Sequence, residues 1–476
     1  MIRRSFVVCL VALGCRQSLP DPVLPLTPTP DAAFRSAPPA LEPQRPRRPP
    51  EVSTTTLANG VTVLVSEQPA RSRVSLVYAN RAAREADDPG TFGLAALTAR
   101  ALDEGTRLSD GRELAHLRFG GTRPAIVADL SGTVVAIEVL GTALAPGLSL
   151  LADFVKNPIF DPAGIDAARA ELGERVFGRS LMIGTQLRRA AYEALTGRID
   201  PSGRNGAGLT DAMVRQFHRE RYTPADSALV IAGPVRSTDA VAAVERALGT
   251  WTALPRAAAA PGAPAAKPRW HATSVIQGLA GDASQARFSL AMPCVGVTDA
   301  ESVNFDVLAM ILANLFGSRA MKALRHEEGI GYGIHADCEQ RQDYGIFWVD
   351  FDVDTLAALE ALEKVVAELQ RLRSERVTEH ELALARARLL GRLEPAVGGS
   401  HALAAIYLLG LPADYFDAYR ARLAAVDAES LRRTAQRYFD RSTMGIAVHG
   451  DPRLLAPELV RFGKQEWSRL EPSTPQ

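Results

Sequence analysis

The chain has 476 residues, of which 47% are hydrophobic and 23% are charged. This length predicts two to four domains, and the composition is typical of a globular protein rather than a disordered or membrane-embedded one. Lysine and arginine together number 54, and so do aspartate and glutamate. The overall charge therefore gives no indication of a nucleic-acid-binding groove.

Residues 1–15 have the pattern of an export signal. Arg3 and Arg4 precede a short apolar run, and Gly14 and Cys15 follow it directly. A charged start and a short apolar core are typical of a secretory leader. A cysteine at this position resembles a bacterial lipoprotein signal, in which the thiol is lipidated after cleavage. We therefore expect a periplasmic protein anchored to a membrane by lipid on Cys15, with a plain signal peptide as the alternative.

The next segment, residues 16–50, is rich in proline and poor in apolar residues. This composition predicts a disordered or polyproline-like tether rather than a folded element. A lipid anchor followed by such a spacer would let a globular body stand away from the membrane.

Residues 51–253, up to an alanine- and proline-rich linker at 254–268, are expected to form one α+β domain. Asn59 and Gly60 separate two runs of strand-forming residues, and this dipeptide favours a hairpin with a type I′ turn. Later β-branched runs predict strands, and segments rich in alanine and leucine predict helices. We expect strands at 74–79, 126–130, 134–140 and 227–232, and helices at 93–106, from 109 onward, before 157, at 161–176 and at 210–221.

Residues 269–470 repeat the same layout. Ser75-Leu76 in an early strand matches Ser289-Leu290, an offset of 214, and Ala232-Gly233 in a late strand matches His449-Gly450, an offset of 217. A nearly constant offset over this distance predicts a tandem duplication of one α+β domain. Each copy is expected to be a mostly antiparallel sheet covered by helices.

The helix expected at 93–106 is the most informative stretch. It reads Gly-Leu-Ala-Ala-Leu-Thr-Ala-Arg-Ala-Leu-Asp-Glu-Gly-Thr, and by itself it is a core helix made of strong helix formers. Leu-Ala-Asn-Gly at 57–60 and Asp-Pro-Gly at 88–90 precede it. In this order the motifs resemble the pitrilysin/insulinase family of zinc metallopeptidases, in its mitochondrial-processing-peptidase-like branch. The resemblance covers about residues 52–465.

Active members of that family carry His-x-x-Glu-His on this helix. The corresponding positions here are Ala96, Leu97, Thr98, Ala99 and Arg100, so both histidines and the glutamate are missing. Two histidines four residues apart bind zinc, and the glutamate takes a proton from the attacking water. Alanine can do neither, and the cation of Arg100 repels a metal ion. We therefore expect this chain to bind no metal and no other cofactor.

A different candidate site lies in the second half. Arg325 and Tyr332 are seven residues apart, near the end of a predicted helix and the start of a predicted strand. They resemble the family's Leu-Arg…Gly-x-x-Tyr element, whose arginine and tyrosine reach the substrate near the zinc. A guanidinium and a phenol both donate hydrogen bonds to a peptide carbonyl, and both would stabilise the oxyanion formed when water attacks it. The alternative is structural, because arginine complements the dipole of a last helical turn and tyrosine favours strands.

Two further pairs leave alternatives open. Glu171 and Glu174 lie where the family supplies its third zinc ligand, but without the histidines they are expected on a solvated helix face. Cys294 and Cys338, at the ends of predicted strands, would form a disulfide in an oxidising compartment or remain two inert thiols.

The resemblance implies both a fold and a role. In the family the two halves face each other like a clamp around an unfolded peptide, and members of this half-size often work in pairs, one with the zinc motif and one without. We expect the zinc-less subunit of a heterodimeric metallopeptidase, inactive alone, that holds peptide through Arg325 and Tyr332 against the zinc of a paralogous partner. The alternative is a structural or peptide-binding relative with no role in proteolysis.

Overall fold

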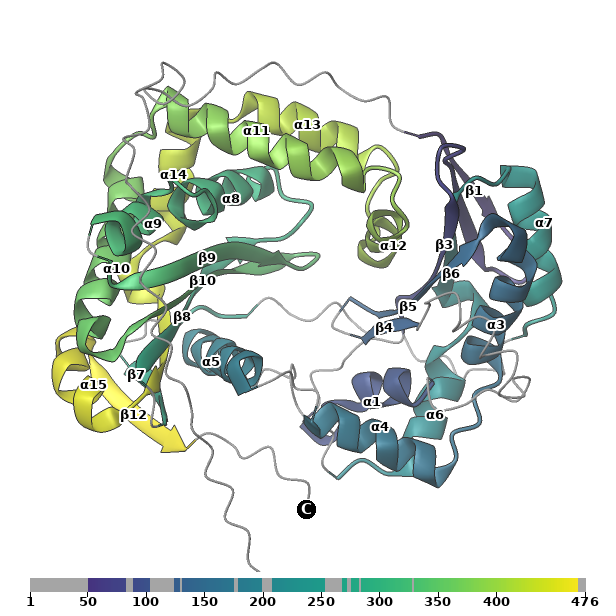
Figure 1. Cartoon of the computed structure of the whole chain (residues 1–476), viewed down its shortest axis with the longest axis horizontal. Coiled ribbons are helices and arrows are strands. Elements are labelled where there is room, and N and C mark those ends of the chain that lie inside the picture. The colour runs from purple at the N-terminus through teal and green to yellow at the C-terminus, as the bar shows by residue number, and fades with distance from the viewer. Residues whose placement is uncertain are drawn as a thin grey trace, which may run out of the picture. The chain divides into compact units, whose positions relative to one another are not determined.

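The structure of the protein is a computed structural model, which describes residues 50–469 except 83–88, 103–123, 129–130, 175–178, 199–207, 253–267, 272–274, 282–283 and 328. The strands among these residues form two mixed sheets of six strands each, with helices packed against them (Figure 1). The α+β class expected from the sequence is confirmed. The leader, Cys15, the tether up to residue 49 and nearly all of the linker at 254–268 lie outside the described residues, so the domain boundaries stay a prediction.

The first sheet contains strands from the first half of the chain, in the order β1-β2-β6-β3-β5-β4. Its neighbouring strands are antiparallel except for β2 and β6, which are parallel. The strands are β1 (Val52–Thr56), β2 (Thr62–Glu67), β3 (Arg73–Asn80), β4 (Ala125–Ala128), β5 (Thr133–Leu140) and β6 (Ser227–Gly233).

The second sheet contains strands from the second half, in the order β12-β7-β11-β8-β10-β9. Strand β7 is parallel to both β11 and β12, and the other pairs are antiparallel. The strands are β7 (Val275–Ala280), β8 (Gln285–Val295), β9 (Gly331–Gln340), β10 (Tyr344–Asp354), β11 (Gly445–Gly450) and β12 (Lys464–Arg469).

Five strands follow the same order in the two sheets, β2-β6-β3-β5-β4 in the first and β7-β11-β8-β10-β9 in the second. Ser75 lies opposite Ala232, and its equivalent Ser289 lies opposite Ala447. The equivalent of Ala232 is therefore Ala447, and the expected match with His449 is wrong by two residues. The sequence comparison aligned the glycines that end β6 and β11, whereas β11 continues two residues further along its neighbour.

In both halves most of the described helices lie in one run, between β5 and β6 in the first half and between β10 and β11 in the second. The helix expected from 109 onward lies outside the described residues. The first half contains α1 (Leu94–Ala101), α3 (Leu144–Lys156), α4 (Pro162–Glu174), α5 (Arg179–Thr196), α6 (Asp211–Arg221) and α7 (Ser237–Leu248). The second half contains α8 (Ser302–Ala309), α9 (Arg319–Met321), α10 (Ala358–Ser374), α11 (Glu379–Ala396), α12 (Ser400–Leu409), α13 (Tyr415–Ala425), α14 (Ala428–Tyr438) and α15 (Pro452–Leu459).

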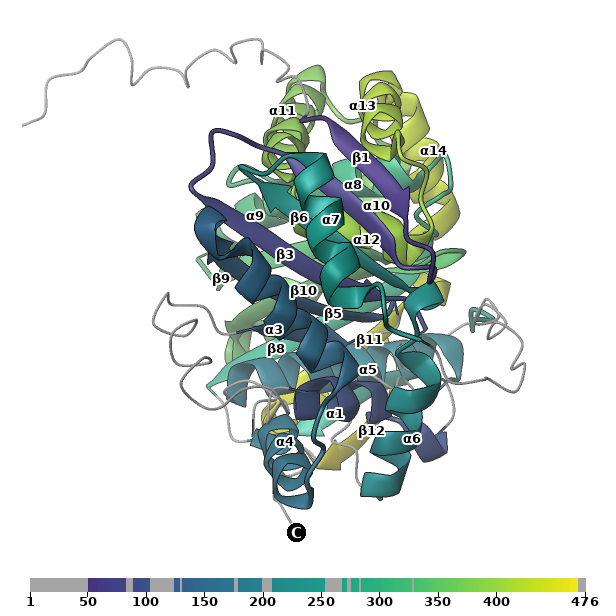
Figure 2. The ribbon, with the colours of Figure 1, turned by 90° about the vertical axis from the view of Figure 1, so that its right-hand side faces the viewer.

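One face of each sheet is covered by helices of its own half. Figure 2 shows α3 and α7 lying across the first sheet, where Val63 and Leu76 pack against Leu148 and Val244. Because strand side chains alternate between the two faces, the neighbouring positions point away from this core. In the second sheet the corresponding core joins Phe288, Leu290 and Phe351 to α8, α10 and α14.

The opposite face of each sheet is covered by a helix from the other half. Helix α12 packs Leu403 and Ile406 against Leu64, Val77 and Val230 of the first sheet. A buried hydrogen bond of 2.7 Å between the hydroxyls of residues 75 and 400 fixes the helix there. The first sheet therefore obtains its second covering layer from the second half of the chain.

Helix α5 makes the reciprocal contact. Its Leu187 and Leu195 pack against Ile346 of β10 and Ala447 of β11. Figure 1 shows α5 lying beside β8 of the second sheet. A Cβ added to Gly445 in β11 would collide with the backbone carbonyl of Ala191 in α5. Glycine at this position therefore allows the helix to approach the sheet closely. The two halves exchange equivalent helices.

The first hairpin differs from the expected type I′ turn. The antiparallel register joins Thr56 to Thr62, so the loop between β1 and β2 has five residues. Gly60 has a positive φ of 97°, but Asn59 does not, as a type I′ turn would require. The Asn59 side chain instead donates to the carbonyls of Leu248 and Trp251, at 2.7 and 3.1 Å. These tertiary hydrogen bonds outweigh the local preference of the dipeptide.

Among the described residues, one helical stretch, Ser302–Arg325, is long and apolar enough to cross a membrane, with a mean hydropathy of 1.4. Length and composition alone are weak evidence for a membrane span. The most apolar part of this stretch is 56% buried inside the protein. Such burial is typical of a helix in the core of a globular protein.

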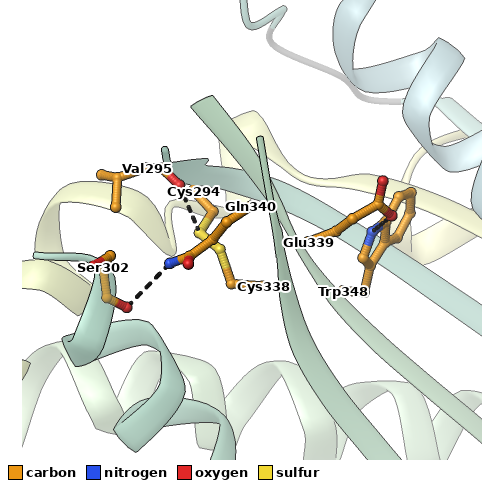
Figure 3. Close-up of a disulfide and its surroundings, with 7 residues drawn as sticks. All are labelled: Cys294, Val295, Ser302, Cys338, Glu339, Gln340 and Trp348. Atoms are coloured by element: carbon orange, nitrogen blue, oxygen red, sulfur yellow. Dashed lines mark hydrogen bonds between the residues drawn. A yellow bond between two sulfur atoms is a disulfide. The ribbon is translucent and has the colours of Figure 1, made fainter. Parts of the chain in front are cut away.

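A disulfide links two strands of the second sheet across the strand that lies between them (Figure 3). It joins Cys294 of β8 to Cys338 of β9, whose Cα atoms are 6.4 Å apart. Strand β10 runs between these two strands, and its Gly345 lies opposite Cys294. A Cβ at Gly345 would lie 3.2 Å from the sulfur of Cys338, so the glycine leaves room for the bridge. The two cysteines, left open as thiols or a disulfide by the sequence, are bonded.

Asp306 on α8 is a half-buried carboxylate that makes stability depend on pH. Burial raises its pKa to about 6, against the lowering effect of the Tyr419 hydroxyl, which donates to it at 2.7 Å. Between about pH 4 and about pH 6 the folded protein holds a proton that the unfolded chain has lost. The free energy of unfolding therefore falls as pH rises through this window, by about 2 to 3 kcal/mol from this group.

Asp306→Asn keeps an oxygen that accepts from Tyr419 but does not titrate. We expect the variant to lose this part of the fall in stability, measured by urea unfolding below and above the window. Asp417→Asn, an exposed carboxylate on the neighbouring α13, is the matched control and should retain the wild-type profile. The same pH profile in Asp306→Asn and the wild type would contradict the assignment.

Candidate functional site

Helix α1 carries the positions of the missing zinc motif. Gly93 precedes it with φ 83°, and the helix is described through Ala101, so the end expected at Gly105 lies outside the described residues. Ala96 and Arg100, one turn apart, are partly exposed, whereas Ala99 is buried. The helix is formed as expected, and these three side chains offer no metal ligand and no general base.

The surroundings of α1 are also defined. The helix packs against α4, α6 and β4, and Glu171 and Glu174 lie in the last turn of α4. No group of three or more His, Cys, Asp or Glu residues in the described parts of the chain is arranged to hold a metal ion. That the chain binds no zinc stays a prediction.

Arg325 and Tyr332 lie on either side of a tight connection. Helix α9 is only three residues long and continues as a π-helical stretch, Lys322–Glu327, that contains Arg325. Gly329 then adopts a positive φ of 69°, and the Ile330 amide donates to the Leu324 carbonyl at 3.0 Å. The chain enters β9 at Gly331, one residue before Tyr332. The structure thus brings the expected helix end and strand start together.

The backbone around this pair is irregular in three places. A first π-helical stretch, Met310–Asn314, precedes the one that contains Arg325. The register of β9 against β10 then shifts between Gly333 and Gly331, which leaves Tyr332 as the extra residue of a β-bulge. π-helical turns and β-bulges are both frequent at functional sites, where they change the direction of side chains. The sequence reasoning predicted an ordinary α-helix and strand here.

The side chain of Arg325 is exposed and lies over an aromatic ring. Its guanidinium carbon is 5.5 Å from the centre of the Phe316 ring, a cation–π arrangement. Phe316 belongs to the short connection between the first π-helical stretch and α9. Sequence reasoning named Arg325 but missed Phe316, because an aromatic residue in an apolar stretch is ordinarily assigned to the core.

Arg319, at the start of α9, anchors the connection to the body of the domain. It donates to both carboxylate oxygens of Glu381, at 2.7 and 3.0 Å. Burial raises the pKa of Glu381, but the hydrogen bonds from Arg319 and Thr378 outweigh it and lower the pKa to about 2. This bidentate pair therefore stays charged at every physiological pH and holds α9 against α11.

A second polar cluster lies between α5 and the second sheet. Arg188 of α5 donates to Asp350 at 2.9 Å and to Asp337 at 2.6 Å, and its guanidinium lies 5.0 Å from the ring of Trp348. Burial lowers the pKa of Arg188, but the two carboxylates outweigh burial and raise it. No sequence pattern predicts this cluster, because α5 belongs to the other half of the chain. Its evident role is to hold α5 on the sheet.

This chain resembles a known protein family in sequence and solved structures in fold. Residues 208–389 match the family model of the peptidase M16 inactive domain, and the expected resemblance to the insulinase-type peptidases is confirmed. No curated protein matches the sequence.

Solved structures share the fold. A peptidase M16 inactive domain from Pseudomonas fluorescens has a TM-score of 0.73 and 20% identity, over 84% of this chain and 98% of its own. A protease from Helicobacter pylori has a TM-score of 0.74 and 16% identity, over 85% of this chain and 100% of its own. The periplasmic protease PqqL from Escherichia coli has a TM-score of 0.65 and 15% identity, over 89% of this chain and 51% of its own.

Proposed function

We propose that this chain, whose residues 208–389 match the model of the peptidase M16 inactive domain, is the zinc-less subunit of a two-chain metallopeptidase. It would contribute the peptide-holding half of an active site and no metal. The zinc, the attacking water and the general base would belong to a paralogous partner that has His-x-x-Glu-His. The pair would hydrolyse peptide bonds, and this chain alone would not.

The observation that carries the proposal is the contrast between the two sites. At α1 the ligand and base positions hold Ala96, Ala99 and Arg100, which cannot support zinc chemistry. At the second site, Arg325 and Tyr332 stand on a π-helical turn and a β-bulge. A chain that had lost every active-site role would have no reason to retain these costly departures from regular structure beside the one matching motif.

A donor pair of this kind fits the chemistry of peptide hydrolysis. The guanidinium and the phenol donate to a substrate carbonyl in the ground state, and they would hold the oxyanion more strongly as charge develops on it. Neither group needs to change its protonation state for this role. The rival function, peptide binding without proteolysis, would use the same donors but would need no partner with a metal.

Export to the periplasm is part of the proposal. Disulfides persist in oxidising compartments and are rare in the bacterial cytosol, and the bond between Cys294 and Cys338 supports an exported location. The likeness in fold to a periplasmic protease points the same way. Lipid on Cys15 would then hold the complex at a membrane.

The test is purification of the full-length protein through an affinity tag from the membranes of its native cell. We expect a second subunit with His-x-x-Glu-His to co-purify, with about one zinc per pair and peptidase activity in the pair only. The same chain produced alone is the control and should contain no stoichiometric zinc. One tightly bound zinc in the isolated chain, or a native preparation without such a partner, would contradict the proposal.

A further inference from the structure

Phe316 is a large apolar side chain at the surface, directly beside Arg325. It is 69% exposed, and the Arg325 guanidinium lies over its ring. A single exposed apolar residue is common and needs no explanation by itself. This one is distinguished by its place between two π-helical stretches and against the cation that the proposed function assigns to peptide binding.

The backbone that presents Phe316 is fixed. The Leu315 amide donates to the Met310 carbonyl at 3.2 Å, and the Ser318 amide donates to the Leu315 carbonyl at 3.0 Å, which closes a tight turn around Phe316. Ser318 is itself buried, and the next residue forms the bidentate pair with Glu381. The exposed ring therefore results from a well-anchored turn rather than from a loosely held loop.

Stacking on a ring leaves the hydrogen-bonding capacity of an arginine intact. The N–H donors of a guanidinium lie in its own plane, so a ring that covers one face does not obstruct them. The ring restricts the rotamers of Arg325 and covers only one face of its guanidinium, whose edges carry the donors that a peptide carbonyl would use. A side chain next to that carbonyl would then come within reach of the ring, since successive Cα atoms are only about 3.8 Å apart.

We propose that Phe316 is a specificity-determining contact, an apolar subsite for the peptide side chain adjacent to the carbonyl that Arg325 binds. The substrate class is an extended peptide with an aliphatic or aromatic residue at that position. Polar and acidic residues there would remove water from the ring without an apolar contact in return. The inference rests on the proposed function in taking Arg325 as a peptide-binding residue.

Fluorescence anisotropy with the full-length protein tests the inference. The probe is a labelled, disordered Gly/Ser host peptide with one central residue set to Leu, Phe, Ser or Asp. We expect the wild type to bind the Leu and Phe hosts about tenfold more tightly than the Ser and Asp hosts, in the range that one apolar contact provides. Phe316→Ser should abolish this preference, and Phe316→Leu should retain it.

Two controls separate the inference from the proposed function. Leu356→Ser removes an apolar side chain that is 86% exposed elsewhere in the same half, and it should leave the preference unchanged. Arg325→Ala should weaken binding of all four hosts to a similar extent. If Arg325→Ala does so while Phe316→Ser keeps the preference, the inference is overturned and the proposed function stands. If the wild type shows no preference among the hosts, the inference is overturned. If Arg325→Ala binds every host as the wild type does, both the inference and the proposed function are overturned.

Discussion

Produced alone, the first half of the chain (residues 50–253) is expected to be insoluble, and so is the second half (268–469). Produced together, the two halves are expected to assemble into a soluble complex with the circular dichroism spectrum of the intact protein. The reason is that each sheet is covered on one face by a helix from the other half. Neither half alone can bury both faces of its sheet.

The size of the effect follows from the contacts of α5. Four of its large apolar side chains are buried, and each contributes about 1.5 to 3 kcal/mol when buried. Their sum, about 6 to 12 kcal/mol, is comparable to the whole stability of an ordinary domain, about 5 to 15 kcal/mol. The four residues are Ile183, Leu187, Tyr192 and Leu195. Loss of the contact with α5 would therefore remove most or all of the free energy of unfolding of the second half.

Gly445→Val in the second half provides the specific test of assembly. The added side chain collides with the Ala191 carbonyl of α5, so the co-produced halves should no longer associate. Gly333→Val in β9, where no atom lies within 4 Å of an added Cβ, is the matched control and should assemble normally. A half that folds alone as a soluble monomer with cooperative unfolding would show that the exchanged helices are dispensable.

Tyr332→Phe is expected to lower the turnover of the reconstituted pair about a hundredfold or more while leaving assembly intact. The substitution removes only the hydroxyl, and loss of one oxyanion donor typically costs on the order of 3 kcal/mol of transition-state stabilisation. Arg325→Ala should have an effect of similar size, with a further loss in peptide affinity. The measurement is cleavage of a fixed peptide by the zinc-bearing partner at saturating concentration of each variant.

Matched substitutions far from the site separate chemistry from general damage. Tyr438→Phe on α14 removes the hydroxyl of a half-buried tyrosine, and Arg433→Ala removes an exposed arginine from the same helix. Both should support wild-type turnover. If Tyr332→Phe and Arg325→Ala also do so while the pair remains assembled, the chain acts as a scaffold or peptide carrier rather than as part of the active site.

The local structure was predictable where neighbouring residues decide it. The strand at 227–233, with every residue buried, and the helix that begins after its capping residue Thr210 both lie within a residue or two of expectation. The exchange of α5 and α12 was not predictable. The apolar residues Leu187 and Leu403 indicate that each helix has a buried face, but the same pattern would result whichever sheet covered it.

The sequence points to the residues of the candidate site but not to its geometry. Arg325 and Tyr332 are singled out by their resemblance to the family's Leu-Arg…Gly-x-x-Tyr element, and their role stays a prediction, whereas an i→i+5 turn and an extra residue in a strand have no marked sequence signal. Helix propensity does not distinguish the π-helical Lys322–Glu327 from an ordinary α-helix, since both use the same φ/ψ region and the same residue types. Phe316 was missed for a related reason, because hydrophobicity predicts burial and the turn that exposes this ring depends on tertiary contacts.

The exchange of helices also sets the order of events during biosynthesis. The last strand of the first sheet ends at Gly233. The helix that covers the second face of this sheet ends at Leu409, which is 176 residues later (409 minus 233). At about 5 to 20 residues per second, the ribosome needs roughly 10 to 35 s to make that stretch. Throughout this interval the nascent first half exposes Leu64, Val77 and Val230 with nothing to cover them. We therefore expect the growing chain to need a holdase chaperone until α12, which ends at Leu409, has been made.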